Sequence, residues 1–456
     1  MKKKLLLKAP ILTQSGYGEH SRFIYRALKE REDIFDIYIE PLNWGRTGWI
    51  WEDTEERKQI DYCVGKFYQA LQEQKTNFFD IGVIVDLPSA WKRVAPYMVG
   101  VTAGVECDAV SPSWLQPCLE QVDQIIVPSK FSKEGFLNAI DKYQHVFDEQ
   151  TRGQITYLND VVDEKIKVVN YPVKDYKEKD LNLQFETDFN FLLVAQWGPR
   201  KNIQETIEGF YQEFFNEAEV GLVVKTSLAR NSIPDRHHVM KKMQEIKNSY
   251  KEAKCKVYLL HGEMTEDEMH SLYHHPKIKA AINFGRGEGY GLPLFEAAYC
   301  GIPVITHNFG GQTDFLYANK KDKKGVEKLR AFFSKVPYKQ LPVDTHAVWK
   351  DVIEPDAEWA FVNMAAAKVA MRDLRKNYNL ALNKSKKLKK SLLENFSLEK
   401  KNEQIVSIVS GEDPFDYDTV SVEELPKISF ITSMYNSEKF FEGFMEDITG
   451  QTIFED

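Results

Sequence analysis

One segment, Ala280 to Phe315, constrains the fold of this chain more than any other. It begins with an apolar run, Ala280 to Phe284, which is typical of a buried parallel strand. Four glycines follow within Gly285 to Gly291, then helical spacing from Leu292 to Tyr299, then a second apolar run. This order predicts a βαβ unit with a glycine-rich loop. Such a loop lets backbone N–H groups approach an anion at the N-terminus of the following helix.

The same alternation of apolar runs and helical stretches occurs twice along the chain. With 456 residues, the chain is too long for one hydrophobic core. We therefore expect an α/β fold with two doubly wound, Rossmann-like units that face a central cleft. The expected divisions are residues 1–175, 176–385, a C-terminal helix region 386–410 that crosses back to the first unit, a linker 411–427, and the truncated start of another domain, 428–456. Residues 143–165 read as an insertion, 173–188 as the connection between the units, and 357–394 as one long helical region.

Composition excludes several classes of protein. The net charge of −8 gives no basic footprint for nucleic acid. The five cysteines are scattered without a CxxC pair, which argues against disulfides and zinc and fits a reducing cytoplasm. The N-terminal MKKKLLLKAPIL has an apolar run too short for a signal peptide and reads as a strand. The sequence contains no run of 18 apolar residues, so we expect no helix that spans a membrane.

Two groups of residues admit a second interpretation. Lysines 384, 386, 387, 389 and 390 fit contact with the anionic inner face of a membrane, or a solvated helix face, which we favour. The neighbouring pairs His237-His238 and His274-His275 suggest metal binding. However, adjacent helical side chains point about 100° apart, so these pairs are predicted to be surface histidines.

The motif around Glu288 and Glu296 resembles a known family. Residues 287–297, GEGYGLPLFEA, resemble the Glu-x7-Glu motif of retaining GT-B glycosyltransferases of family 4, also called group 1. Residues 301–305, 310–312, 16–18 and 102–129 are also similar to that family, so the resemblance spans roughly residues 5–410. Separately, residues 428–452 resemble the opening of a family 2 glycosyltransferase of GT-A fold.

The resemblance implies transfer of a sugar from a UDP- or GDP-linked donor with retention of anomeric configuration. The acceptor would be a glycan or a lipid-linked sugar, in bacterial surface polysaccharide synthesis. GT-B enzymes stabilise the leaving diphosphate with side chains and a helix N-terminus, so we expect no metal and no other cofactor. Fixed positive charges at that diphosphate lower the barrier most.

Donor-binding roles follow by motif position. The resemblance places Glu296 on the ribose hydroxyls and Glu288 on the sugar near the reacting carbon. It assigns the rest of the loop to the donor as well: Gly287, Gly289, Tyr290, Gly291 and Leu292. The alternatives are an ordinary helix carboxylate, a solvated loop glutamate and a plain flexible turn.

The cations that grip the diphosphate are less well matched. The family usually has an Arg and, about five residues on, a Lys; Lys201 fits the Lys position, while Trp197 stands where the Arg would be. Arg200 or Lys225 could replace that Arg. For each of these three cations the alternative is a surface side chain.

The first unit supplies the acceptor side. Gly16 and Gly18 form a turn that brings backbone close to the donor phosphate or the acceptor, or is simply a tight turn. Many family members place a His in this cleft, but residues 98–108 contain none. Glu106 or Asp108 is expected there instead, to orient the acceptor hydroxyl or act as a base; the alternatives are a solvated loop and a helix N-cap.

Two other functions remain open at the level of sequence. One is a catalytically silent GT-B module that binds nucleotide or glycan and scaffolds a second glycosyltransferase domain. The other is a Rossmann-type oxidoreductase, which we disfavour because the turn after the first strand lacks a full GxGxxG and no ribose-binding acid follows the second strand.

Overall fold

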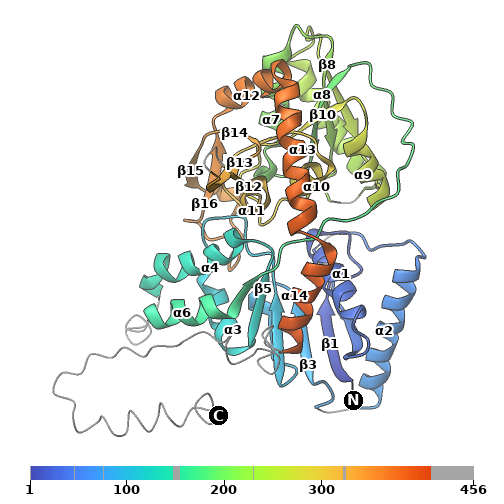
Figure 1. The fold of residues 1–456 in the computed structure, drawn as a ribbon, viewed down its shortest axis with the longest axis vertical. Coiled ribbons are helices and arrows are strands. Elements are labelled where there is room, and N and C mark those ends of the chain that lie inside the picture. Colours follow the sequence, from blue (N-terminus) through green and yellow to red (C-terminus); the bar gives the residue numbers. More distant parts are fainter. Residues whose placement is uncertain are drawn as a thin grey trace, which may run out of the picture. The chain divides into compact units, whose positions relative to one another are not determined.

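The computed structural model describes residues 2–411, apart from Arg46 and Arg230 and residues 75–76, 147–154 and 322–324. The expected linker beyond residue 411 and the expected domain start at 428–456 lie outside the described residues. Figure 1 shows two lobes, each built on a parallel sheet with helices packed on it.

The first lobe holds a six-stranded sheet in the order β2-β1-β3-β4-β5-β6, with every neighbouring pair parallel. Its core strand β3 is buried along its whole length, which explains its unbroken apolar sequence. Its strands are β1 (Lys3–Ala9), β2 (Phe35–Pro41), β3 (Ile81–Val85), β4 (Tyr97–Val101), β5 (Gln124–Val127) and β6 (Ile166–Val168). Its helices are α1 (Gly16–Lys29), α2 (Glu55–Gln72), α3 (Leu115–Glu120), α4 (Lys130–Lys142) and α6 (Ile155–Lys165).

The second lobe repeats this design with the order β14-β11-β10-β7-β8-β9, again parallel throughout. Its strands are β7 (Phe189–Val194), β8 (Val220–Lys225), β9 (Lys256–Leu260), β10 (Ile278–Asn283), β11 (Val304–Thr306) and β14 (Ser334–Lys335). Its helices are α7 (Ile203–Phe214), α8 (Ile233–Asn248), α9 (Glu266–His274), α10 (Leu292–Cys300), α11 (Thr313–Leu316), α12 (Met364–Lys376) and α13 (Tyr378–Asn395). A capping box formed by Thr265 and Glu268 begins α9. The expectation of two doubly wound units is confirmed.

Strand order fixes where ligands can bind. In the second lobe the order reverses between β7 and β10, because β8 and β9 continue on one side and β11 on the other. Loops that leave neighbouring strands in opposite directions open a crevice at this switch point. The loop after β7 contains Arg200 and Lys201, and the loop after β10 contains Glu288.

The region expected as one helix over residues 357–394 is different in the structure. Residues Glu358–Val362 form β16, which pairs antiparallel with β15 (Tyr338–Pro342). The helical part is broken at Asn377, where α12 ends and α13 begins. A second hairpin, β12 (Tyr317–Lys321) with β13 (Glu327–Ala331), was also not expected. Trp359 is 1% exposed, so burial of its ring against the first lobe's core favours the strand over helix propensity.

The last helix, α14 (Leu398–Ser410), returns to the first lobe as expected and packs beside α1 (Figure 1). Asn402 donates a hydrogen bond to Glu30 at 2.8 Å, and the Tyr97 hydroxyl donates one to the Ile408 carbonyl at 2.8 Å. Ile405 is fully buried in the same contact. Among the described residues, no helix combines the length and the apolar character needed to cross a membrane.

Replacing Ile405 by alanine should therefore weaken the docking of α14. A buried Ile-to-Ala change costs about 2–5 kcal/mol, which urea denaturation of the purified protein measures. The matched control is Leu398→Ala on the same helix, because Leu398 is 44% exposed and its loss should change stability by less than about 0.5 kcal/mol. Equal effects of the two substitutions would contradict this packing.

Candidate active site

The glycine-rich loop after β10 brings a carboxylate and an amine together at the switch point. Glu288 is 6% exposed, and the Lys201 Nζ donates to both of its carboxylate oxygens at 2.5 and 2.6 Å. Lys201 ends a short 3-10 turn, Pro199–Lys201, that follows β7. Asn202 comes next in the left-handed conformation (φ 49°), which Asn tolerates better than most residues. The sharp turn aims Lys201 at the crevice.

Neighbouring polar groups hold the Glu288 carboxylate in place. Asn283, the last residue of β10, donates to Glu288 Oε1 at 3.1 Å, while its own oxygen accepts from the Gly285 N–H at 2.7 Å. His307 is buried and donates from Nε2 to the Gly285 carbonyl at 2.6 Å. Its Nδ1 accepts from the Phe309 N–H, so the ring is neutral with the proton on Nε2. The base of the loop is therefore fixed by hydrogen bonds.

Electrostatics keep Glu288 ionised. Burial alone would raise its pKa, but Lys201 and Arg200 outweigh burial and hold the pKa at about 2. Burial and the charge of Arg200 lower the pKa of Lys201. The Lys201 side chain keeps 17% of its surface exposed, so a charged ligand can reach this ion pair.

The first lobe adds a fourth charge. Glu106, in the loop after β4, pairs with Arg200 at 2.8 Å, and Arg200 also donates to the Gly287 carbonyl at 2.7 Å. Arg200 lies 3.5 Å from Glu288. The structure thus joins Glu106, Arg200, Lys201 and Glu288 into one network, which we call the charge cluster.

The glycine loop also touches the first lobe through its backbone. The Ser129 hydroxyl donates to the Gly289 carbonyl at 2.5 Å, and Ser132 does so at 3.3 Å. A Cβ atom on Gly287 would collide with the Glu106 carbonyl oxygen, and one on Gly289 would lie 2.7 Å from the Ala103 oxygen. Glycine is needed at both positions because the two backbones approach so closely.

Glu296 lies outside the charge cluster, on the helix that follows the glycine-rich loop. It projects from α10 into a cavity of about 250 Å³ whose walls come from both lobes, including Gln14, Arg22, Lys174 and Met264. Gly291 allows α10 to begin there, because it adopts φ 91° at the N-cap, and Leu292 also lines the cavity. The cavity is large enough for part of a nucleoside.

Aromatic side chains line the cavity around the Glu296 carboxyl. Tyr273 donates to its Oε2 at 3.0 Å, and Tyr176 and Tyr299 line the same cavity. Burial raises the pKa of Glu296 to about 7, against the smaller opposing effects of Lys174 and the Tyr273 hydrogen bond. The two glutamates of the motif therefore differ: Glu288 is held ionised, while Glu296 titrates near neutrality.

Lys174 connects the two lobes at this cavity. Its amine pairs with Glu19 of α1 and, at 2.9 Å, with Glu266 of α9. It lies in the segment 173–188, which was expected only to connect the units. Arg22 and Arg26 pair with Glu19 as well, so this partly buried carboxylate has three cationic partners.

Three expected site residues are placed elsewhere. Asp108 accepts from the Glu358 N–H at 2.6 Å and pairs with Lys142 at 2.8 Å, so both its oxygens are engaged in joining β16 to the first lobe. Lys225 donates to the Gly262 carbonyl at 2.5 Å and lines a separate cavity of about 530 Å³. The buried Tyr290 side chain packs against other aromatic rings.

The turn after β1 has its own structural reasons for glycine. The Ser15 hydroxyl caps α1 by accepting from the Gly18 N–H at 2.9 Å. A Cβ atom on Gly18 would collide with the Thr13 carbonyl, whereas one on Gly16 would meet nothing within 4 Å. Close packing therefore requires glycine at position 18 but not at position 16, and Gln14 of the same turn lines the smaller cavity.

The sequence signals missed some of these residues. Asn283 and His307 stand at strand ends next to the glycine loop, and that position was the available signal for both. Lys174 gave no signal, because its importance depends on two partners that lie 155 and 92 residues away in the chain. Trp197, expected in place of the family's Arg, stays partly exposed, with Lys242 Nζ 6.0 Å from its ring.

A comparison with protein families bears on this arrangement. Residues 177–328 match the family described as "Glycosyl transferases group 1". This segment, about one third of the chain, contains Arg200, Lys201, Glu288 and Glu296, and its match indicates that the chain is a glycosyltransferase. No curated protein sequence matches the chain.

Solved structures agree on the fold. HepE from Anabaena, in complex with UDP and glucose, aligns over 90% of this chain and 100% of its own, with 11% identity and a TM-score of 0.53. Sucrose-phosphate synthase from Thermosynechococcus elongatus aligns over 90% and 99%, with 13% identity and a TM-score of 0.54. An E. coli trehalose-6-phosphate structure bound with UDP-2-fluoro glucose aligns over 90% and 100%, with 10% identity and a TM-score of 0.54. The GT-B fold expected from the sequence is confirmed.

The raised pKa of Glu296 predicts how this glycosyltransferase responds to pH. An unfolded glutamate ionises near pH 4.3, so between about pH 4.5 and 7 the native state binds more protons than the unfolded state. Stability contributed by the protonated group is therefore present at low pH and lost as pH rises through about 7. Glu296→Gln should melt at a progressively higher temperature than the wild type as pH rises across this window, in thermal melts from pH 4.5 to 8.

The control for this comparison is Glu252→Gln, which removes an exposed carboxyl from the same lobe. Its melting temperature should differ from that of the wild type by an amount that does not change over the same window. If Glu296→Gln gives an equally flat difference, Glu296 does not titrate near neutral pH.

Proposed function

We propose that the chain transfers a sugar from a nucleoside diphosphate donor to a hydroxyl acceptor with retention of anomeric configuration. The observation that carries this proposal is the charge cluster at the switch point. It combines two cations, able to bind a diphosphate, with two carboxylates, one from each lobe. The neighbouring cavity at Glu296 is suited to the nucleoside.

In the proposed reaction, Lys201 and Arg200 exchange their carboxylate partners for the donor diphosphate. The bond between the anomeric carbon and the diphosphate breaks, and the acceptor oxygen bonds to the same face of that carbon. The electron pair of the broken bond goes to the diphosphate, where the two cations stabilise the growing negative charge. The acceptor proton leaves to the diphosphate or to Glu106. No metal has a part in this step.

The donor's other contacts follow from the positions of the two glutamates. Glu288, freed from part of its pairing, accepts hydrogen bonds from the sugar hydroxyls. Glu296 accepts from the ribose hydroxyls in the smaller cavity. We propose that the loop and the first lobe separate to admit the donor, because Gly287 and Gly289 pack against residues 103–106.

The donor base and the acceptor are chosen by analogy. HepE is known in complexes with UDP-glucose and with UDP, which makes UDP-sugars the first donors to test here, with GDP-sugars next. We propose a glycan or lipid-linked acceptor, as in bacterial surface polysaccharide synthesis in the cytoplasm. Four lysines of α13, Lys384, Lys386, Lys387 and Lys390, are exposed and could contact the anionic inner face of a membrane.

A catalytically silent binding module is the second candidate. The observation in its favour is that each cation of the charge cluster already has a carboxylate partner, and Trp197 stands where the family's Arg would be. Calorimetry of nucleotide-sugar binding, together with an assay of sugar transfer and hydrolysis, separates the two functions. Binding without transfer or hydrolysis would support the silent module.

Lys201→Ala should lower kcat/KM by about 100- to 1000-fold, the loss seen when a donor to a developing negative charge is removed. A thermal-shift screen of UDP- and GDP-sugars first identifies the donor, and initial rates of transfer then measure the effect. Glu296→Ala should act mainly through a raised KM for the donor, because the ribose is bound equally in ground and transition states.

Lys256→Ala is the matched control, since this lysine is exposed and pairs only with Glu186 among its charged neighbours in the described part of the chain. It should leave both constants unchanged. If both Lys201→Ala and Glu296→Ala transfer sugar at the wild-type rate, the proposed function is wrong.

A further inference from the structure

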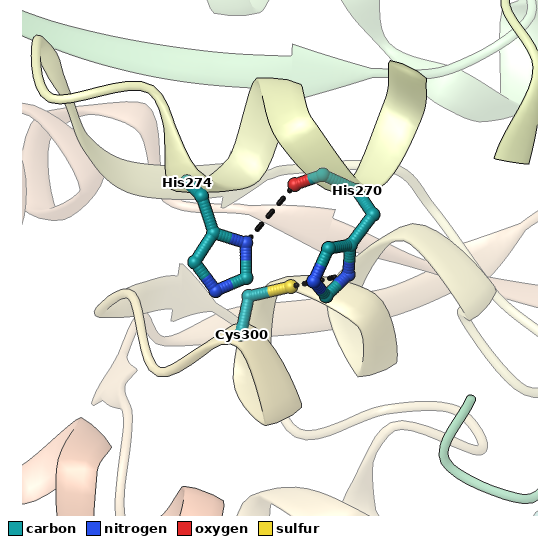
Figure 2. Close-up of side chains that lie close together, drawn as sticks. All are labelled: His270, His274 and Cys300. Carbon is teal, nitrogen blue, oxygen red and sulfur yellow. Dashed lines mark hydrogen bonds between the residues drawn. The ribbon is translucent and has the colours of Figure 1, made fainter. Parts of the chain in front are cut away.

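Two helices of the second lobe bring three metal-ligating side chains together. His270 and His274 lie one turn apart on α9, and Cys300 is the last residue of α10. One ligand atom from each side chain lies within 4.8 Å of the other two (Figure 2). His270 Nδ1 is 3.4 Å from the Cys300 Sγ. The sequence did not reveal this group because the cysteine is 30 residues from His270.

We propose that His270, His274 and Cys300 form a binding site for Zn²⁺. Side chains four residues apart on a helix share one face, so both imidazoles can reach one ion. Two imidazoles and a thiolate are a ligand set that zinc prefers. Bond lengths of about 2.0–2.3 Å place tetrahedral ligands about 3.3–3.8 Å apart. His270 Nδ1 and Cys300 Sγ already have this spacing, and no other pair has to close by more than about 1.5 Å when the ion binds.

The hydrogen bond made by His274 supports this assignment. Its Nδ1 lies 3.1 Å from the His270 carbonyl oxygen, as Figure 2 shows. A carbonyl only accepts, so Nδ1 carries the proton and Nε2 carries the free lone pair. Metal-bound histidines usually donate their second ring N–H to a backbone carbonyl or a carboxylate in this way. His274 therefore has the tautomer that a metal ligand needs.

The His270 ring is held in place as well. Tyr176 stacks on it with ring centroids 4.4 Å apart, and the Tyr176 hydroxyl accepts a hydrogen bond from Tyr299 at 3.1 Å. Without the ion, the Cys300 thiol and His270 Nδ1 share one proton in their hydrogen bond. When the ion binds, it takes the place of that proton. Fixed ligands lose less entropy on binding, which favours a site over a chance cluster.

The three side chains leave the fourth coordination position of the ion open to solvent. His274 is exposed, His270 partly buried and Cys300 buried, so the ion reaches the site from the His274 side. Three protein ligands and a water complete four-coordinate zinc. Lys389 of α13 brings positive charge toward His270 and Cys300, so we expect an exchangeable ion rather than a permanent structural one.

The site adjoins the cavity of Glu296. His270, Tyr176 and Tyr299 line that cavity, and Glu296 precedes Cys300 by one turn on α10. An ion here would tie α9 to α10 at the cavity wall. This role does not depend on the proposed sugar transfer, because the ion lies apart from the charge cluster.

Cobalt titration of the metal-free full-length protein tests the site, since Co²⁺ reports thiolate ligation by charge-transfer absorption in the near ultraviolet. We expect one equivalent to bind with this absorption and Zn²⁺ to displace it. Cys300→Ser should abolish the absorption, and His274→Ala should weaken binding by about 10-fold or more. His237→Ala removes an exposed histidine from α8 and should change nothing.

Two results would overturn the proposal. One is binding of Co²⁺ without thiolate absorption in the wild type. The other is equal affinity in His274→Ala and His237→Ala, which would mean that surface histidines in general bind the ion. His274 is exposed, so its substitution leaves the fold intact and decides the matter even if Cys300→Ser does not fold.

Discussion

The buried pair of Glu288 and Lys201 is the interaction on which the arrangement of the site depends. A carboxylate that is 6% exposed can stay ionised only beside a cation, so the loops after β7 and β10 must meet. That requirement gives a role to the left-handed turn at Asn202 and to the hydrogen bonds of Asn283 and His307. Removing Lys201 would leave the buried Glu288 carboxylate with Arg200, 3.5 Å away, as its remaining cationic partner.

The same cluster also joins the two lobes. Glu106 comes from the first lobe and neutralises Arg200, while Gly287 and Gly289 pack against the backbone of residues 103–106. In our account the donor diphosphate takes over cations that the carboxylates hold in its absence. Binding of donor would then change the contacts between the lobes, and the charge cluster would link both events.

The sequence predicted the fold because its signals are local. Apolar runs separated by helical spacing define both sheets, and the motif spacing placed Glu288 and Glu296 on a loop and a helix. Positions that depend on distant partners were not predictable in this way. Asp108 joins β16, Trp359 turns residues 358–362 into a strand, and Cys300 meets histidines of another helix. The domain boundaries and the roles of the site residues remain predictions.

The central claim is that Lys201 binds the diphosphate while Glu296 binds the ribose. Calorimetry of the free nucleoside and its diphosphate, with the base found in the donor screen, tests this most directly. Lys201→Ala should weaken the diphosphate by about 10-fold or more and leave the nucleoside unchanged, since a hydrogen bond to a charged group contributes about 1.5–3 kcal/mol. Glu296→Ala should weaken both ligands alike. Equal losses for both ligands in Lys201→Ala, or no loss in either, would contradict the account.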